Sequence, residues 1–403
     1  MSWLNKIKSL GETALRVGKK IKYGNRLGYQ IIDTESALKD FARILEKEKT
    51  VAVDLEADSM YHFREKVCLI QIATKRKNVI IDPLQLDDLS PLAPFFFRHD
   101  IKKVFHGADY DIRSLYRDFN IEISNLFDTQ IASRFLGIRE TGLEAVLQKH
   151  FNIRLDKKYQ KKDWSKRPLP KDMLEYAAKD AIYLAPLANV LEKELEKKGR
   201  LFWVHEECDD LTKVRAASFD GEPLFLRFKG AGRLPQGDLA VLENLLQVRK
   251  EIAEKKDKPL FKIIGNDSLL KIARAKPLNP KHLEKIKALS RKQARMYGDA
   301  LVETVREALE IPETDFPVYP RRKGPVSSPK VPERVKAIRR WRGVRAKSLE
   351  IDPALICNKL LMNAIATKNP RNIKELEEVK EMKNWQRKAF GKDIVTVLRK
   401  MKR

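Results

Sequence analysis

In the stretch Val51-Ala-Val-Asp-Leu-Glu-Ala57, a short apolar run leads directly into two acids, which predicts a buried strand that carries a polar site. Side chains alternate across a strand, so Asp54 and Glu56 share one face. A solvated surface pair is the simple alternative, since acids two apart occur by chance in a charged chain. A carboxylate that follows a buried strand is costly, however, unless a cation or a cleft accompanies it. The context therefore favours a functional site.

Further short apolar runs extend this pattern, and the region from about residue 29 to 201 is typical of an α/β domain. The predicted strands are Val51 to Leu55, Val67 to Ala73, Val79 to Ile81, and Val104 to Phe105. They predict one mostly parallel or mixed sheet. After Pro170, residues Asp172 to Lys198 carry a wide apolar face that predicts one long helix.

A second acidic segment, Phe105-His-Gly-Ala-Asp-Tyr-Asp-Ile112, follows an apolar strand and opens a predicted helix. It contains two acids, Asp109 and Asp111. Acids at a helix start also act as caps that complement the helix dipole, and we assign this role to Asp109. Asp111 lies one turn before Leu115, which places it on the edge that faces the sheet.

The spacing Tyr-x3-Asp occurs twice, at Tyr159 with Asp163 and at Tyr176 with Asp180. The first pair lies among lysines, which suits a solvated loop. The second pair lies on an apolar helix, where residues four apart share one side and small neighbours leave room for metal ions. The pKa of tyrosine is about 10, so a neutral Tyr176 is a poor base and would instead orient a water molecule.

Four acids thus converge, Asp54, Glu56, Asp111 and Asp180. Without cations they would repel one another and be forced to protonate. Two divalent ions, Mg²⁺ or Mn²⁺, about 3.5–4 Å apart would cancel the charge and clamp a phosphoryl group. The predicted chemistry is phosphodiester hydrolysis.

Composition indicates the partner. The 403 residues suggest two to three domains, and the net charge of +26 favours a polyanion, nucleic acid first. No apolar run is long enough to span a bilayer, so we expect a soluble protein. Three scattered cysteines fit a reducing compartment and form no zinc spacing. Residues 1–25 are interpreted as a basic arm, with an organelle-targeting helix as the alternative.

An internal duplication fills the C-terminal half. A shift of 93 residues aligns Arg249 with Arg342, and Gly298 with Gly391. We predict two copies of one small helical module, each with its own core. The predicted boundaries are residues 26–220 for the α/β domain, 235–310 for the first module, 311–332 for a stiff proline-rich linker, and 333–403 for the second module.

Basic stretches with aromatic residues suggest nucleic-acid contacts. The segment from Lys157 to Trp164, which includes Gln160, has two readings, a charged surface loop or a rim that grips phosphate and stacks a base on Trp164. We favour the rim. Arg340 and Arg342 lie in a second basic stretch, where a solvated helix face is an equal alternative.

These motifs resemble the DEDD superfamily of 3′-to-5′ exonucleases, and within it ribonuclease D and the related nuclear exosome exonuclease. The likeness covers nearly the whole chain. Asp54-Leu-Glu56 is similar to the first motif, His106-Gly-Ala-Asp-Tyr-Asp111 to the second, and Tyr176-Ala-Ala-Lys-Asp180 to the third. Position 176 is Tyr, as in the tyrosine branch of the superfamily. The two modules resemble HRDC domains.

The resemblance implies an α/β ribonuclease H-like exonuclease domain, a mixed sheet flanked by helices, followed by two all-helical HRDC domains. It further implies that Asp54 bridges two metals, that Glu56 and Asp180 complete one site, and that Asp111 helps to hold the other through water. The implied activity is a bacterial, cytoplasmic 3′-to-5′ exoribonuclease that releases nucleoside 5′-monophosphates from single-stranded 3′ ends, with tRNA precursors as expected substrates. His106 is a further predicted RNA contact. A DNA exonuclease and an inactive RNA-binding scaffold remain alternatives.

Overall fold

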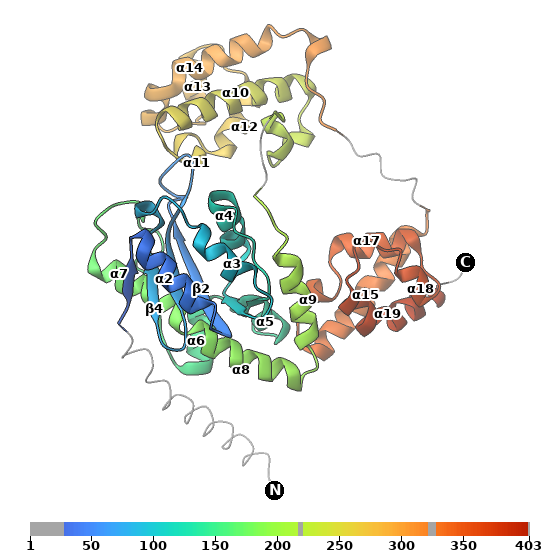
Figure 1. Ribbon diagram of the computed structural model, residues 1–403. Helices are drawn as coiled ribbons and strands as arrows, with labels where there is room; N and C mark the ends of the chain where they lie inside the picture. Colours follow the sequence, from blue (N-terminus) through green and yellow to red (C-terminus); the bar gives the residue numbers. More distant parts are fainter. Residues whose placement is uncertain (1–27, 217–220, 321–327, 402–403) are drawn as a thin grey trace. The chain divides into compact units, whose positions relative to one another are not determined.

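The computed structural model describes residues 28–216, 221–320 and 328–401 (Figure 1). The predicted basic arm, residues 1–25, lies outside these ranges, as do residues 321–327 of the predicted linker. Within the described ranges, no helix is long and apolar enough to cross a membrane.

The α/β domain contains one mixed sheet of six strands, which confirms the predicted sheet. The strands are β1 (Gln30–Ile32), β2 (Thr50–Ala57), β3 (Val67–Ala73), β4 (Asn78–Ile81), β5 (Lys102–Phe105) and β6 (Leu126–Asp128). Their order is β1-β4-β3-β2-β5-β6. Strand β1 pairs in parallel with β4, β2 with β5, and β5 with β6, whereas β3 and β4 are antiparallel. The acids of β2 therefore lie in the interior of the sheet rather than at an edge.

Helices flank this sheet. They are α2 (Glu35–Leu45), α3 (Ala93–Phe97), α4 (Asp109–Phe119), α5 (Thr129–Phe135), α6 (Leu143–Phe151), α7 (Lys171–Ile182), α8 (Leu184–Lys197) and α9 (Leu201–Leu211). Helix α7 packs against β3 and β4, α8 packs against β5, and α9 packs against β6.

The long helix predicted from Asp172 to Lys198 is wrong, because the chain breaks it into α7 and α8 at Tyr183. Pro186 supplies the physical reason. A proline inside a helix has no N–H to donate, and its ring clashes with the carbonyl four residues earlier, here that of Ile182. The break leaves Tyr176 and Asp180 on the shorter helix α7.

The two helical modules follow the predicted duplication. The first contains α10 (Gln236–Lys255), α11 (Leu260–Ile263), α12 (Asn266–Ala275), α13 (Pro280–Lys285) and α14 (Arg291–Leu309), and the second contains α15 (Val331–Leu349), α16 (Pro353–Ile356), α17 (Lys359–Lys368), α18 (Ile373–Leu376) and α19 (Asn384–Arg399). Helices α11, α12, α13 and α14 begin 93 residues before α16, α17, α18 and α19, so the register of the duplication is kept in three dimensions.

Part of the segment predicted as a stiff, extended linker packs against the core of the first module. Ile311 and Tyr319 pack against the apolar core of that module, and the Tyr319 hydroxyl donates to the carbonyl of Leu226 at 3.2 Å. A Cβ at Gly232 would lie 3.0 Å from the Tyr319 ring, which would have to shift slightly. Two residues of the predicted linker are thus packed on the core of the first module, and α15 begins at Val331, within the predicted linker.

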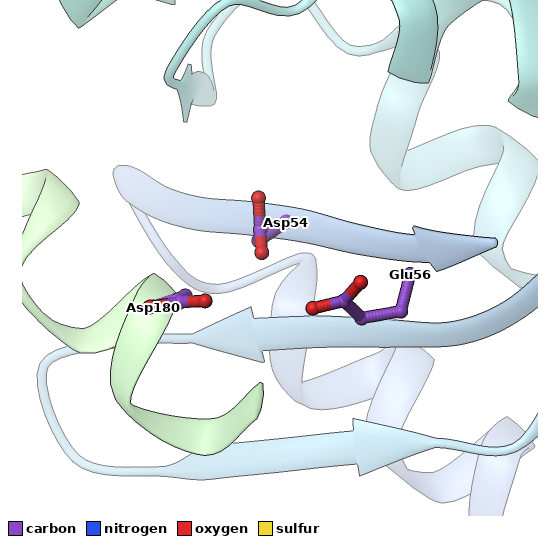
Figure 2. Close-up of side chains that lie close together, drawn as sticks. All are labelled: Asp54, Glu56 and Asp180. Atoms are coloured by element: carbon purple, nitrogen blue, oxygen red, sulfur yellow. The ribbon is translucent and has the colours of Figure 1, made fainter. Parts of the chain in front are cut away.

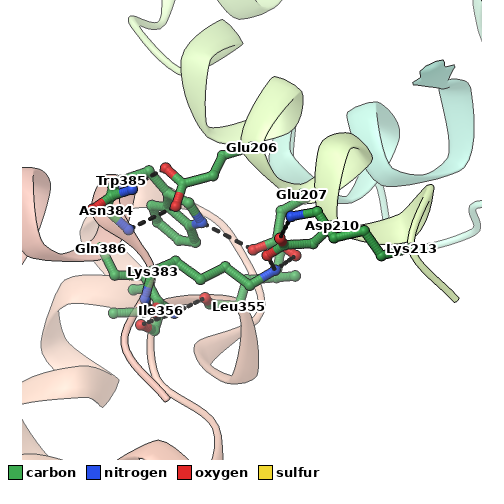
Figure 3. A network of polar contacts seen from close by, with 10 residues as sticks. All are labelled: Glu206, Glu207, Asp210, Lys213, Leu355, Ile356, Lys383, Asn384, Trp385 and Gln386. Carbon is green, nitrogen blue, oxygen red and sulfur yellow. Dashed lines mark hydrogen bonds and ion pairs between the residues drawn. The ribbon is translucent and has the colours of Figure 1, made fainter. Parts of the chain in front are cut away.

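The described chain divides into two compact units. One unit combines most of the α/β domain with the second module, and the other combines residues 57–66 with the first module. In the first unit, a single apolar core includes strands of the sheet and Trp385 of α19. Lys383 pairs with Glu207 at 2.7 Å, and the Trp385 indole N–H donates to the same carboxylate at 2.9 Å (Figure 3). The second module therefore does not hold a separate core, contrary to the prediction.

Candidate active site

Strand β2 positions the first two acids. Val51, Ala52 and Val53 are completely buried, which fixes the strand within the sheet. Asp54 and Glu56 follow them and are only partly buried. The apolar residues thus anchor the strand while its two acids stay partly accessible.

Three carboxylates come together, those of Asp54, Glu56 and Asp180 (Figure 2). One oxygen from each lies within 4.8 Å of the others. Asp180 comes from α7, and the buried Asn78 of β4 holds this helix by donating from Nδ2 to the carbonyl of Ala178 at 3.1 Å. The predicted convergence of a strand pair with a helix residue is therefore present in the structure.

Asp111 lies near this group without being part of it. It is buried in the first turn of α4, and it raises the pKa of Glu56 through its charge. Asp128 organises the turn before α4, because it accepts from the amides of Gly107 at 3.0 Å and Ala108 at 2.8 Å. Asp109 forms no cap hydrogen bond and instead pairs with Arg113 at 2.7 Å, so its prediction as the cap is wrong.

Burial and mutual repulsion make these acids costly as bare anions. Burial raises the pKa of Asp54 to about 7 and, together with the charge of Asp54, that of Asp180 to about 8. The pKa values of Glu56 and Asp111 are also raised, first by burial and then by neighbouring carboxylates. A cation would relieve this cost, and a donor set made only of carboxylate oxygens suits Mg²⁺ or Mn²⁺.

Tyr176 lies against the acids as a neutral phenol. Burial raises its pKa above the ordinary value for tyrosine, and the charges of Asp180 and Glu56 raise it further. Its hydroxyl hydrogen-bonds to Asp180, one turn along α7. The group can donate or accept a hydrogen bond, but it cannot serve as a base near neutral pH.

Two aromatic residues of the loop before α7 pack against the ring of Tyr176. Tyr159 packs edge-on to Tyr176 with 5.7 Å between ring centroids, and Trp164 lies 6.1 Å away at a tilt. Trp164 is only 1% exposed, so the prediction that it stacks a base is wrong. Its charged neighbours suggested a surface loop, but the indole faces the core. Tyr159 also differs from the predicted solvated loop, because it is half-buried against the site.

A cavity of about 330 Å³ opens beside Tyr176 and Asp180. The predicted rim residues Lys157 and Gln160 line it, together with Glu140 and Glu144. Lys157 pairs with Glu144 at 2.6 Å. Two of the predicted RNA contacts, Lys157 and Gln160, thus line the cavity, whereas Trp164 is buried and does not.

The other predicted RNA contacts have separate surroundings. His106 holds its Nδ1 2.8 Å from the Thr129 hydroxyl, and burial lowers its pKa, so the ring is neutral at pH 7. Arg340 is exposed on α15. Arg342 is half-buried and donates to the carbonyl of Cys357 at 2.7 Å, which gives it an internal role in place of the predicted RNA contact.

No local sequence pattern predicts the roles of two supporting residues, Arg167 and Asp82. Arg167 donates to both oxygens of Asp82, at 2.6 and 2.7 Å, and to the carbonyls of Trp164 and Cys68. This network ties the loop before α7 to the sheet. Arg167 and Asp82 are 85 residues apart in sequence, so no local pattern could have paired them.

The chain is similar to known proteins along most of its length. Residues 29–196 match a family model described as 3′-5′ exonuclease, and residues 238–305 and 332–398 each match the HRDC domain model. Ribonuclease D of Bartonella henselae is 31% identical over 72% of this chain and 71% of its own. That of Nitrobacter hamburgensis is 27% identical over 90% of this chain and 93% of its own.

A solved structure shares the fold. The crystal structure of Escherichia coli RNase D, titled an exoribonuclease involved in structured RNA processing, superposes with a TM-score of 0.70. It covers 94% of this chain and 100% of that chain at 24% identity. The arrangement of an exonuclease domain followed by two helical modules is therefore shared.

Proposed function

Since the chain belongs to the ribonuclease D family and is a 3′-5′ exoribonuclease, we propose that it trims the single-stranded 3′ ends of structured RNAs, tRNA precursors among them, in the cytoplasm. Membership of this family implies dependence on divalent metal ions. We further propose that two such ions, Mg²⁺ or Mn²⁺, are used. The observation that carries the mechanism is the convergence of Asp54, Glu56 and Asp180 within 4.8 Å.

In this proposal the carboxylates of Asp54, Glu56 and Asp180 hold the ions, and Asp111 assists from the start of α4. The bound ions would supply charge neutralisation and an activated water for hydrolysis of a phosphodiester. The neutral hydroxyl of Tyr176 donates to Asp180 and orients that water by accepting a hydrogen bond from it. Lys157 and Gln160 line the adjacent cavity and are proposed to hold the terminal nucleotides.

Asp54→Asn tests the site. The change keeps the shape of the side chain and removes one ligand charge, so release of mononucleotides from a 3′-tailed RNA should fall by on the order of 10³-fold or more. Binding of Mn²⁺, followed by calorimetry, should weaken in parallel. Asp109→Asn, which changes an acid two residues from Asp111 but outside the cluster, supplies the matched control and should hydrolyse RNA like the wild type. Equal hydrolysis by Asp54→Asn and the wild type would contradict the mechanism.

The same variant has a second readout that is independent of activity. A carboxyl whose pKa is raised to about 7 in the folded state binds its proton more tightly there than in the unfolded chain. In metal-free buffer, the wild type should therefore lose stability as the pH rises from about 4 to 7. Asp54→Asn should lose less, and its melting temperature at pH 8 should equal or exceed that of the wild type. A lower melting temperature would mean that Asp54 stabilises the fold as an anion.

The substrate is tested by comparing RNA and DNA oligonucleotides of the same sequence with the wild-type protein and Mg²⁺ or Mn²⁺. Faster release of nucleoside 5′-monophosphates from RNA is expected. Preferential degradation of DNA would contradict the proposed RNA specificity, because discrimination requires a contact with the 2′-hydroxyl.

A further inference from the structure

We infer that a basic cleft between the exonuclease domain and the second helical module binds the single-stranded RNA that precedes the 3′ end held in the active site. The cleft encloses about 1090 Å³, more than three times the volume of the cavity beside Tyr176. Both of its walls belong to the same compact unit. The inference rests on the proposed function, because it extends the path of the same RNA.

One connection, residues 136–142 between α5 and α6, contributes to both the cleft and the active-site cavity. Ile138, Arg139 and Thr141 line the cleft, whereas Glu140 and Gly142 line the active-site cavity. The two hollows therefore lie on either side of a single short segment of chain. An RNA strand that leaves the cavity across this segment enters the cleft.

The charge of the cleft suits a phosphate backbone. Five exposed cations line it, and none forms an ion pair among the described residues: Arg134, Arg139, Lys149, Lys198 and Lys347. Of the three acids in the lining, Glu350 faces the buried guanidinium of Arg200, and Asp352 caps α16 by accepting from the Ala354 amide at 2.7 Å. Glu194 lies 3.6 Å from His150. Five cations against three acids leave the lining with a net positive charge.

The walls of the cleft are held at a fixed distance. Arg200 is buried and bridges them, since it donates to the carbonyl of Phe135 and to that of Leu349, each at 2.8 Å. Gly137 lies so close to the carbonyl of Glu350 that a Cβ there would be 2.0 Å from the oxygen. The cations are therefore presented by a preformed surface, which reduces the ordering cost of binding.

The volume and charge favour a strand of nucleic acid over a small ligand. Pockets for small molecules usually enclose roughly 300–1,000 Å³ and are mostly apolar. This cleft exceeds that range and carries cations on α5, α6 and α15, on the connection between α5 and α6, and just after the end of α8. A flexible polyanion can contact such separated charges one phosphate at a time.

The test compares two double variants with the same change of charge on neighbouring elements. Lys198→Glu with Lys347→Glu alters the cleft, and Lys193→Glu with Lys336→Glu alters exposed lysines on α8 and α15 that do not line it. Both are made in an Asp54→Asn background for binding and in the wild type for hydrolysis. Fluorescence anisotropy with a 20-nucleotide single-stranded RNA at several salt concentrations gives affinity and salt slope.

The cleft variant should bind the 20-mer at least about tenfold more weakly, and its salt slope should flatten by about 1.4, because each phosphate contact on a single strand contributes roughly 0.7. Its hydrolysis of a 3-nucleotide RNA, which offers few phosphates to the cleft, should match the wild type. Affinity and salt slope equal to those of the control variant would overturn the inference. Absence of hydrolysis of any RNA by the wild type would instead overturn the proposed function, while the binding result would still decide the cleft.

Discussion

The two helical modules repeat one internal framework and differ in what they are attached to. In the first, Arg249 donates to the carbonyl of Ile264 at 3.1 Å, and in the second Arg342 donates to that of Cys357 at 2.7 Å. Gln293 and Gln386 likewise donate to the carbonyls of Ile263 and Ile356. Every one of these pairs is related by the shift of 93 residues. The duplication has thus kept the bonds that close each module.

The outer surfaces have diverged. The position of Trp385, completely buried beside the exonuclease domain, is held by the exposed Lys292 in the first module. Lys347, which lines the basic cleft, corresponds to Glu254, which pairs with Arg64 at 2.9 Å. At this position the second module presents a cation, Lys347, to the basic cleft, whereas the first module presents an anion, Glu254, to residues 57–66. Changes at a few surface positions have given equivalent modules different attachments.

Of the variants that probe the two modules, Trp385→Ala should lower the free energy of unfolding most. The indole stacks on Trp203 with 4.9 Å between ring centroids and meets Phe135 edge-on at 5.3 Å. Truncating a buried tryptophan costs about 3–5 kcal/mol, so the unfolding transition of the unit that contains it should move to markedly lower urea. Lys292→Ala, the matched change in the first module, should shift unfolding by no more than about 0.5 kcal/mol. Equal effects would mean that α19 does not anchor the second module.

Arg249→Met and Arg342→Met test the shared framework. Each change keeps an unbranched side chain but leaves a carbonyl without its charged donor, at a cost of about 1–3 kcal/mol. Both variants should lose stability in urea unfolding because the bond to the carbonyl recurs in both copies. Arg249→Met should lose more, because Arg249 is more deeply buried and also donates to Asn266 Oδ1 at 2.7 Å. Arg291→Met, at an exposed residue of the first module, should change little. A loss confined to one copy would show that the framework is not equivalent.

The main features of the fold and of the acid cluster could be predicted from sequence because local patterns carry them. The apolar run before Asp54 marks a strand, and Pro170 marks the start of α7. Where prediction failed, a distant partner decided the outcome. The chain around Trp164 is strongly charged, yet the indole is buried because Tyr176 covers it from another element. The pairing of Arg167 with Asp82 is equally invisible in either local segment.

The attachment of the second module shows the same limit. Trp385 is an aromatic residue within the predicted second module, and nothing in the repeat indicates that Glu207 of α9 accepts from its indole N–H. The repeat predicts each module's internal bonds because both partners recur at the same spacing. It cannot predict an interface whose other half lies in an unrelated domain.

Gly298→Ala and Gly391→Ala probe packing at equivalent positions of α14 and α19. Alanine is favoured over glycine inside a helix by about 1 kcal/mol. A new Cβ at position 298 would lie 3.5 Å from Leu283, an ordinary contact, whereas at position 391 it would lie 3.3 Å from Leu376, which must yield. Thermal unfolding should therefore show that Gly298→Ala stabilises its unit, and that Gly391→Ala stabilises less or not at all. A greater gain at position 391 would contradict the tighter packing of the second copy.

Asp257→Asn should have the smallest effect and tests the attachment peculiar to the first module. Asp257 accepts from His62 Nδ1 at 2.6 Å and from the Phe63 amide at 3.0 Å. These bonds, that from His62 first, lower the pKa of Asp257. A carboxyl with a lowered pKa stabilises the folded state above its ordinary pKa of about 3.9, and this contribution is lost as the pH falls through the lowered value. The melting temperature of the variant should thus lie slightly below that of the wild type at pH 7 and converge with it in acid.

Asp299→Asn, at an exposed aspartate of the same module, is the control. A difference that persists unchanged at low pH would mean that the loop is held by shape and not by the Asp257 anion.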